Sequence, residues 1–313
     1  MHEIILHHYP RSPFAEKVRV ALGLKGLAYG SVTIPVWMPK PELMPLTGGY
    51  RRTPVLQVGA DIYCDTLIIL RQLERMQKTP TFFPAGPEGL ATMLGWGIEK
   101  SIFNAVIGVI VGLTGQNYRR ELIEDRLPFF GFSLEHADML AKQALFVNRL
   151  TAHFVWLADI LADGRAFLLG TAPSAADLCA YHPLWHLRRA GGNAEAAKTV
   201  LELMPTLKPL LPWMDRMAAI GHGSPHELTG AEALEIAADA APSEPASEDG
   251  ALLLGVRVGE MVRAMPDDTG RDPVTGRLIA VTAHEIVLRR TDERVGEMNV
   301  HFPRAGFEIE GAG

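Results

Sequence analysis

The residues best suited to chemistry near the start of the chain lie where an apolar strand runs into a helix. EIILHH predicts the strand, and SPFAEKVRVALGLKG predicts a helix that starts at Ser12-Pro13. Serine is a favoured N-cap and proline suits the first helical position, so this pair is a complete helix-start signal. A helix N-terminus also presents free N–H groups and a partial positive charge to a bound anion. Ser12 is therefore either a cap alone or a cap that also holds a reactive sulfur.

Energies decide whether such a hydroxyl could activate a thiol without a general base. A free thiol has a pKa of about 8.5, so little of it is ionised at neutral pH. A hydrogen bond to a charged group is worth about 1.5–3 kcal/mol, and a helix N-terminus adds about 0.3–2 kcal/mol. Because one pKa unit corresponds to about 1.36 kcal/mol, the two effects together could lower a thiol pKa by about two units.

The elements that must position Ser12 fall into zones of different composition. Residues 1–80 predict strand, helix, strand, short helix, two strands and a helix, which is a parallel crossover followed by an antiparallel hairpin in a mixed sheet. TPTFFPAGPEG is a linker rich in proline and glycine. Residues 89–221 predict an all-helical domain. Its expected helices cover residues 90–115, 117–127, 133–162, 174–190, 193–203 and 206–220.

The remaining residues change character. Residues 222–250 predict a linker with one short helix, because loop-like and acidic segments flank AEALEIAADA. From residue 251 to residue 313 the hydrophobic period changes from 3.6 to 2, and turn residues separate the alternating runs. We expect a small all-β domain there. It could cover an active site, extend a dimer interface or bind a partner.

Composition excludes several function classes. The 313 residues are 48% hydrophobic with a formal net charge of −6, so they predict a globular protein without the basic surface that nucleic acid requires. The longest apolar run, Ala105–Leu113, is far shorter than the ~20 residues of a membrane span, and the N-terminus does not resemble a signal peptide. The two cysteines, Cys64 and Cys179, form neither a disulfide framework nor a metal motif. We expect a cytoplasmic protein with no metal, no membrane and no nucleic-acid partner.

Four segments in order carry a resemblance to a known family. They are SPFAEKVR, YRRTPVL, YCDTLIIL and PSAADL, and together they resemble the glutathione transferase superfamily over about 220 residues. The resemblance implies an α+β multidomain fold: a thioredoxin-like N-terminal domain that binds glutathione, and an all-α C-terminal domain of the glutathione transferase type. The small all-β extension lies outside this plan. The resemblance also implies a homodimer.

The resemblance assigns roles to four residues of the first domain. Pro54 would be a cis proline, and the Thr53 backbone before it would bind the extended ligand; the alternative is an ordinary trans strand start. Asp65 would pair with the ligand ammonium, and Thr66 would bind the γ-glutamyl carboxylate at a helix N-terminus. Their alternative is a simple N-cap pair. In PSAADL, Ser174 and Asp177 predict a structural capping box.

One departure from the family pattern limits the chemistry. The omega class, which SPFAEKVR is similar to, has cysteine where this chain has Ser12, and serine cannot form a mixed disulfide. Thiolate activation by a hydroxyl is then the expected mechanism. Tyr9 is the runner-up, because tyrosine-type members place their phenol at the end of the first strand. Cys64 is expected in the core of the small domain and not as a nucleophile.

Further residues could complete the site. Lys40 and Arg52 are candidates for the glycyl carboxylate of glutathione, or else they are surface charges. A hydrophobic substrate pocket is expected from aromatic residues, whose alternative is ordinary core packing: Phe14, Trp96, Phe103 and Tyr118.

The expected function is that of a glutathione transferase, an enzyme of detoxification. It would use glutathione as co-substrate, activating its thiolate for conjugation to a hydrophobic electrophile or for peroxide reduction. The alternative is a non-catalytic protein that binds glutathione or another ligand and uses the β extension as an interaction module. The sequence does not name the electrophile.

Overall fold

The computed structural model describes residues 2–247 and 255–313, and residues 2–80 form the expected thioredoxin-like unit. Strand β1 pairs in parallel with β2, and helix α1 connects the two strands. Strand β3 pairs antiparallel with β1 on one side and with β4 on the other. The predicted crossover, hairpin and mixed sheet are thus confirmed. The elements are β1 (Ile4–His8), α1 (Pro13–Lys25), β2 (Ala28–Thr33), α2 (Met44–Thr47), β3 (Val55–Val58), β4 (Asp61–Cys64) and α3 (Thr66–Met76).

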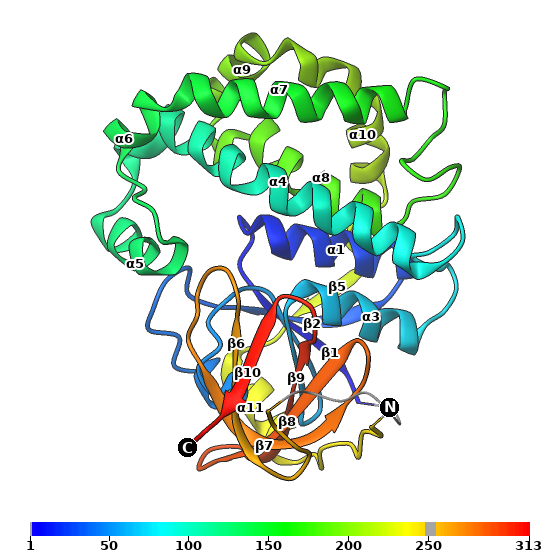
Figure 1. Cartoon of the computed structure of the whole chain (residues 1–313), viewed down its shortest axis with the longest axis vertical. Helices are drawn as coiled ribbons and strands as arrows, with labels where there is room; N and C mark the ends of the chain where they lie inside the picture. The colour runs from blue at the N-terminus through cyan, green and yellow to red at the C-terminus, as the bar shows by residue number, and fades with distance from the viewer. Residues whose placement is uncertain (1, 248–254) are drawn as a thin grey trace.

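The second unit is all-helical, as expected, and lies above the sheet in Figure 1 with α1 between the two. Its helices are α4 (Glu88–Thr114), α5 (Arg120–Phe130), α6 (His136–Ala141), α7 (Gln143–Ile160), α8 (Ala175–Arg188), α9 (Ala194–Leu203) and α10 (Leu211–Ala219), with 3-10 turns at Gly115–Asn117, Ala190–Gly192 and Pro205–Leu210. The single helix predicted over residues 133–162 is wrong, because the chain breaks at Lys142, whose ψ of 3° is not helical. The predicted capping box of Ser174 and Asp177 starts α8.

Helix α4 is the longest helix of the described chain and forms the spine of the helical unit. Residues Glu88–Asn117 are long and apolar enough to cross a membrane by length and composition alone, with a mean hydropathy of 1.4. Half of that apolar window is buried inside the protein, where α4 packs against α6, α7 and α8. The apolar side chains of α4 therefore contribute to the buried core of the helical unit.

The C-terminal extension is built of strands, as predicted, and these strands continue the N-terminal sheet. The described strands form one ten-stranded sheet in the order β10-β6-β7-β8-β9-β4-β3-β1-β2-β5. Strand β9 pairs in parallel with β4, and Figure 1 shows the extension in orange and red at the lower end of the molecule. The added strands are β6 (Met261–Pro266), β7 (Val274–Val281), β8 (Glu285–Asp292), β9 (Gly296–Pro303) and β10 (Phe307–Gly311).

This arrangement has a physical reason in the edge of the thioredoxin-like unit. Strand β4 would otherwise present unpaired backbone groups along a sheet edge, and β9 satisfies them. Apolar residues of both units then form one buried cluster, in which Ile62 of β4 packs with Val300 of β9. The segment expected as a linker contributes too: β5 (Ser224–Glu227) pairs with β2, and α11 (Gly230–Ala238) packs on the same cluster.

A buried ionic cluster joins the extension to β4. The ring of His301 on β9 donates from Nε2 to Asp61 (2.9 Å) and from Nδ1 to Glu285 on β8 (2.7 Å), and it stacks on Tyr63 at 4.3 Å between centroids. Burial opposes the charge on the imidazole, but the two carboxylates raise the pKa of His301 above its ordinary value. The same contacts outweigh burial and lower the pKa values of Asp61 and Glu285. We therefore expect an imidazolium between two carboxylates.

His301→Gln should lower the free energy of unfolding by about 3 kcal/mol near pH 6, because it leaves the buried Asp61 carboxylate without its cation and leaves Glu285 with only its ion pair with Arg75. The stabilisation from protonated His301 is complete below its unfolded pKa of 6.5 and is lost as the pH rises through the raised folded value. The stabilisation from ionised Asp61 and Glu285 changes in the opposite direction: it is lost as the pH falls through their lowered folded pKa values. The deficit of the variant should thus shrink between pH 6 and pH 9 in urea unfolding.

The matched control is His284→Gln, because His284 is exposed in the turn before β8. It should leave unfolding within about 0.5 kcal/mol of wild type at both pH values. A deficit of His301→Gln that stays constant from pH 6 to pH 9 would contradict the imidazolium assignment.

Candidate active site

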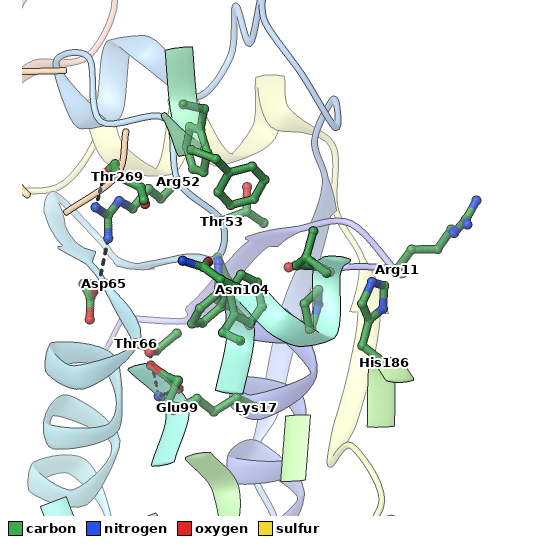
Figure 2. A pocket seen from close by; sticks show the side chains of 18 of the residues that line it. Arg11, Lys17, Arg52, Thr53, Asp65, Thr66, Glu99, Asn104, His186 and Thr269 are labelled. Atoms are coloured by element: carbon green, nitrogen blue, oxygen red, sulfur yellow. Dashed lines mark hydrogen bonds and ion pairs between the residues drawn. The ribbon is translucent and has the colours of Figure 1, made fainter. Parts of the chain in front are cut away.

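A cavity of about 810 Å³ opens where the thioredoxin-like unit, the helical unit and the extension meet. Its polar wall comes mainly from the loops and helix starts at the edge of the sheet, and Figure 2 shows this wall from close by. Every site residue named from the sequence lines the cavity: Tyr9, Ser12, Phe14, Lys40, Arg52, Thr53, Pro54, Asp65, Thr66, Trp96, Phe103 and Tyr118. The roles of these residues stay predictions.

Ser12 is the N-cap of α1, so the capping prediction is confirmed. Its Oγ accepts a hydrogen bond from the backbone N–H of Ala15 at 3.1 Å, and its side chain is almost fully buried. A hydroxyl that accepts one bond still has its own proton to donate, and no acceptor within the described residues takes that proton. Tyr9, the runner-up hydroxyl, is half-buried on the same wall, and its carbonyl accepts from the N–H of Ser12 at 3.1 Å.

The peptide bond between Thr53 and Pro54 is cis, as predicted. Lys40 is buried beside it and is not a surface charge: its Nζ donates to Thr53 Oγ1 at 3.0 Å and to the carbonyl of Arg51 at 2.9 Å. Burial, followed by repulsion from the Arg126 and Arg51 guanidinium groups, lowers the pKa of Lys40 to about 7. The Lys40 amine next to the cis peptide can therefore gain or lose its proton near neutral pH.

Asp65 and Thr66 begin α3, so the N-cap reading is also confirmed. Oδ1 of Asp65 accepts from the N–H of Leu67 at 2.9 Å, and the backbone of Asp65 has a φ of 93°, which is costly for a residue other than glycine. The first N–H groups of α3 have no acceptor inside the helix. They lie at the cavity wall together with the Thr66 hydroxyl, where a carboxylate could accept from them.

Sequence reasoning missed a buried ion pair that supports Thr66 from behind. Lys17 on α1 donates to Thr66 Oγ1 at 2.9 Å and pairs with Glu99 of α4 at 2.7 Å. His182 of α8 contacts the same Glu99 oxygen at 2.6 Å. Although burial opposes its charge, Lys17 and then His182 lower the pKa of Glu99 to about 2. Burial likewise opposes the charge on Lys17, but the contacts with Cys179 and Glu99 raise its pKa.

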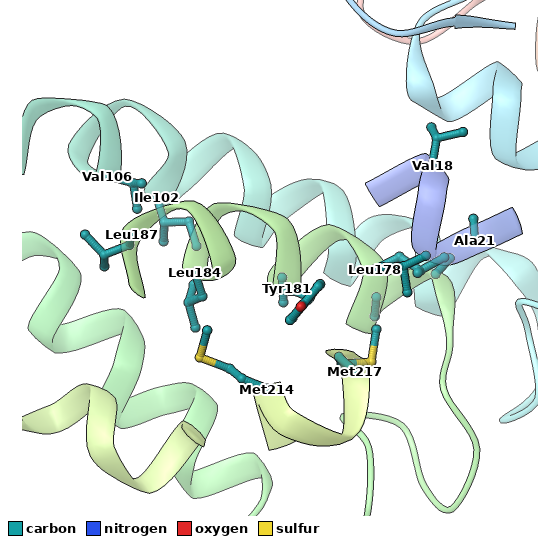
Figure 3. Packing of buried hydrophobic residues seen from close by; sticks show 14 of the residues in the cluster. Val18, Ala21, Ile102, Val106, Leu178, Tyr181, Leu184, Leu187, Met214 and Met217 are labelled. Carbon is teal, nitrogen blue, oxygen red and sulfur yellow. The ribbon is translucent and has the colours of Figure 1, made fainter. Parts of the chain in front are cut away.

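The burial of α1 on every side explains why Lys17 needs a partner. The helix lies between the sheet and α8, and Figure 3 shows Val18 and Ala21 of α1 in the same buried cluster as Leu178 and Leu184 of α8. A charged residue in such a helix must be paired. The available sequence signal was a lysine inside a helix that connects two parallel strands.

Arg52 lies apart from Lys40, toward the start of α3. Its Nη1 is 3.9 Å from Asp65, while its Nη2 donates to the Asp268 carboxylate and to the carbonyl of Thr269 in the loop between β6 and β7. Figure 2 shows Thr269 and Asp65 on either side of the guanidinium. The chain separates Arg52 from Asp268 by 216 positions, so no local pattern could have predicted this contact.

The opposite wall is aromatic. The rings of Phe14 and Phe103 lie 4.7 Å apart between centroids, and Lys100 lies 5.9 Å from the centre of the Trp96 ring. Tyr118 lines the end of the wall beyond α4. Within the described parts of the chain, no group of three or more histidine, cysteine, aspartate or glutamate residues is arranged to hold a metal ion.

Comparison with known proteins identifies the family to which this fold belongs. Residues 6–81 match the model of the glutathione S-transferase N-terminal domain, and residues 121–216 match that of the glutathione S-transferase C-terminal domain. The crystal structure of a GST-like protein from Pseudomonas syringae is 37% identical, with a TM-score of 0.75, and the match covers 99% of this chain and 100% of that chain. The chain therefore belongs to the glutathione S-transferase family.

More distant relatives differ in what their names describe. FtsZ-localized protein A of Caulobacter vibrioides is 26% identical over 222 residues, which is 67% of this chain and 91% of that protein. Glutathione S-transferase U10 of Arabidopsis thaliana is 27% identical over 130 residues, 41% of this chain and 56% of its own length. A Ceriporiopsis subvermispora glutathione S-transferase, solved in complex with glutathione, shares the fold at 19% identity and a TM-score of 0.54, covering 70% of this chain and 98% of that one.

Lys17→Met should lower the free energy of unfolding by about 3 kcal/mol, because it leaves the Glu99 carboxylate buried without its cation. The double variant Lys17→Met/Glu99→Gln should be less destabilised than the sum of the two single variants, since it removes both charges together. Urea unfolding at pH 7 measures each value.

The control is Lys198→Met, which removes a cation whose pairing with Glu195 is exposed on α9. It should change stability by less than about 0.5 kcal/mol. Strict additivity of the Lys17 and Glu99 substitutions would show that the two side chains do not act as a pair.

Proposed function

We propose that this protein binds glutathione in the cavity and activates its thiol, with the Ser12 hydroxyl donating a hydrogen bond to the thiolate. The observation that carries the proposal is the position of that hydroxyl. It lies at the N-terminus of α1, on the wall of a cavity that also holds a cis-proline peptide and a second helix N-terminus. A thiolate there would meet a donor and the positive end of a helix at the same time.

The remaining polar groups fit the other parts of the tripeptide. The γ-glutamyl carboxylate would accept from the first N–H groups of α3 and from the Thr66 hydroxyl, and Asp65 would take the ammonium. The cysteinyl main chain would pair with the Thr53 backbone in an extended conformation. The glycyl carboxylate would meet Lys40, so that each charged end of the ligand has a partner of opposite sign.

The chemistry needs no enzyme cysteine. The thiol proton leaves to solvent, and the thiolate attacks an electrophilic carbon, forming a carbon–sulfur bond while a leaving group departs or the adduct takes up a proton. With a peroxide as substrate, two glutathione molecules are oxidised to the disulfide, and the peroxide is reduced to an alcohol and water. The Phe14, Phe103 and Trp96 rings favour a hydrophobic second substrate.

The second candidate is ligand binding without turnover. It is favoured by the similarity to FtsZ-localized protein A, whose name describes localisation with FtsZ and not a reaction. Dimerisation, as the family resemblance implies, and a reducing compartment, as two free buried cysteines suggest, belong to the same proposal.

Ser12→Ala should raise the thiol pKa of bound glutathione. In the wild-type complex we expect a pKa near 6.5, about two units below that of free thiol, and in the variant a return most of the way to about 8.5. Ultraviolet absorbance of the thiolate across a pH titration measures both. Ser12→Thr, which keeps the hydroxyl and the cap, should retain the lowered value.

Thr229→Ala is the control for the loss of a helix cap, because it removes the N-cap of α11, which lies away from the cavity. It should leave the thiol pKa unchanged. Equal thiol pKa values in wild type and Ser12→Ala would reduce Ser12 to a cap and transfer the role to Tyr9, tested by Tyr9→Phe. A bound thiol with an unshifted pKa in wild type would favour binding without turnover.

Lys40 should make ligand affinity depend on pH. The glycyl carboxylate favours protonated Lys40, so affinity should be highest below its pKa of about 7 and fall as the pH rises through that value. With S-methylglutathione, whose sulfur cannot ionise, the dissociation constant should be about tenfold larger at pH 8 than at pH 6. The buried His8 and His186, with pKa values lowered by burial to about 4 and about 3, do not titrate in this range.

Lys40→Arg keeps its charge at both pH values, so its affinity should be almost independent of pH. Calorimetric titration at pH 6 and pH 8 measures the dissociation constants. The same tenfold loss in Lys40→Arg and in wild type would refute the assignment of Lys40 to the carboxylate.

A further inference from the structure

The loop between β6 and β7 reaches from the extension into the wall of the cavity. Asp268 and Thr269 of this loop line the cavity, as do Ala305 and Gly306 of the turn after β9 and Phe307 at the start of β10. The extension therefore forms part of the wall of the cavity that a ligand would enter.

The loop is held in place by contacts with all three units. The N–H of Gly270 donates to the carbonyl of Phe129 on α5 at 2.8 Å, and the N–H of Asp267 donates to the carbonyl of Gly306 at 3.0 Å. The Asp268 carboxylate accepts from Lys100 of α4 and from Arg52. These contacts fix the carboxylate of Asp268 at the junction of the three units.

The loop between β6 and β7 holds the side chain of Arg52 in position. Both protons of its Nη2 are taken by Asp268 and the Thr269 carbonyl, while its Nη1 lies 3.9 Å from Asp65. Its Nε–H is buried and has no acceptor within the described residues. Arg52 lines the cavity, and its Nη1, which makes no hydrogen bond within the described residues, is the donor that a ligand acceptor could satisfy.

We propose that the C-terminal extension completes the ligand site, with Asp268 as a positioning residue that holds Arg52 against the α-carboxylate of a γ-glutamyl ligand. This inference rests on the proposed function. The carboxylate would sit between the first N–H groups of α3 and the free donors of Arg52. Two carboxylates, Asp65 and Asp268, balance the guanidinium before the ligand arrives, so the arginine is neither drawn into solvent nor able to rotate away.

The rim location of Asp268 makes its replacement a mild change. Its carboxylate is partly exposed, and the substitution Asp268→Asn keeps the shape of the side chain while removing its charge. Although partial burial opposes ionisation, Arg52 and Lys100 lower the pKa of Asp268 to about 2, so the native side chain is charged at neutral pH. Asp267, its exposed neighbour in the same loop, is absent from the cavity wall and offers a matched control.

The test compares three ligands on Asp268→Asn, Asp267→Asn and wild type by calorimetry at pH 7. The ligands are S-methylglutathione, its analogue without the α-amino group, and its analogue without the α-carboxylate. Asp268→Asn should weaken binding of the two ligands that keep the α-carboxylate by about tenfold and leave the third unchanged. Asp267→Asn should bind all three as wild type does.

Each other outcome overturns the inference in an identifiable way. Equal weakening of all three ligands would make Asp268 a structural residue of the loop, and selective loss for the ligands that keep the ammonium would make it an ammonium site. Tighter binding would make Asp268 a competitor for Arg52, and unchanged binding would remove it from the site. If wild type binds none of the ligands, the proposed function fails together with this inference, whereas the other outcomes leave the proposed function standing.

Discussion

Two helix N-termini opening on one cavity are the constraint on which the rest of the structure depends. The parallel crossover from β1 to β2 places the start of α1 at the end of β1, and the turn after β4 places the start of α3 beside it. Both starts carry unpaired N–H groups and a partial positive charge. The cis peptide before Pro54 lines the same cavity, so an extended anionic ligand can reach both helices.

The rest of the molecule fixes the N-termini of α1 and α3 relative to each other. The Lys17–Glu99–His182 contacts join α1, α4 and α8 directly behind Thr66. On the other side, the His301 cluster and the β4–β9 pairing fix the extension to the sheet edge, so that its loop can reach Arg52. A buried ion pair adds little net stability on its own account, but breaking it is expensive, so such pairs keep elements in one arrangement.

The sequence was sufficient for features that are set locally. Caps at Ser12, Asp65 and Ser174 follow from side-chain chemistry within three residues, and the crossover and hairpin follow from hydrophobic period and turn residues. The cis bond at Pro54 and the cavity lining followed from family resemblance. Contacts across long separations carried no local signal. The pairing of β9 with β4, the partner of Lys17 and the partner of Arg52 all depend on how distant surfaces dock.

A crystal structure of the protein with glutathione bound tests the central claim most directly. The expected structure has the glutathione sulfur within hydrogen-bond reach of Ser12 Oγ, roughly 3–3.5 Å away. It also has the γ-glutamyl carboxylate at the N-terminus of α3, within reach of the Arg52 donors. Glutathione bound with its sulfur pointing away from α1, or bound outside the cavity, would contradict the assignment of Ser12 as the activating hydroxyl.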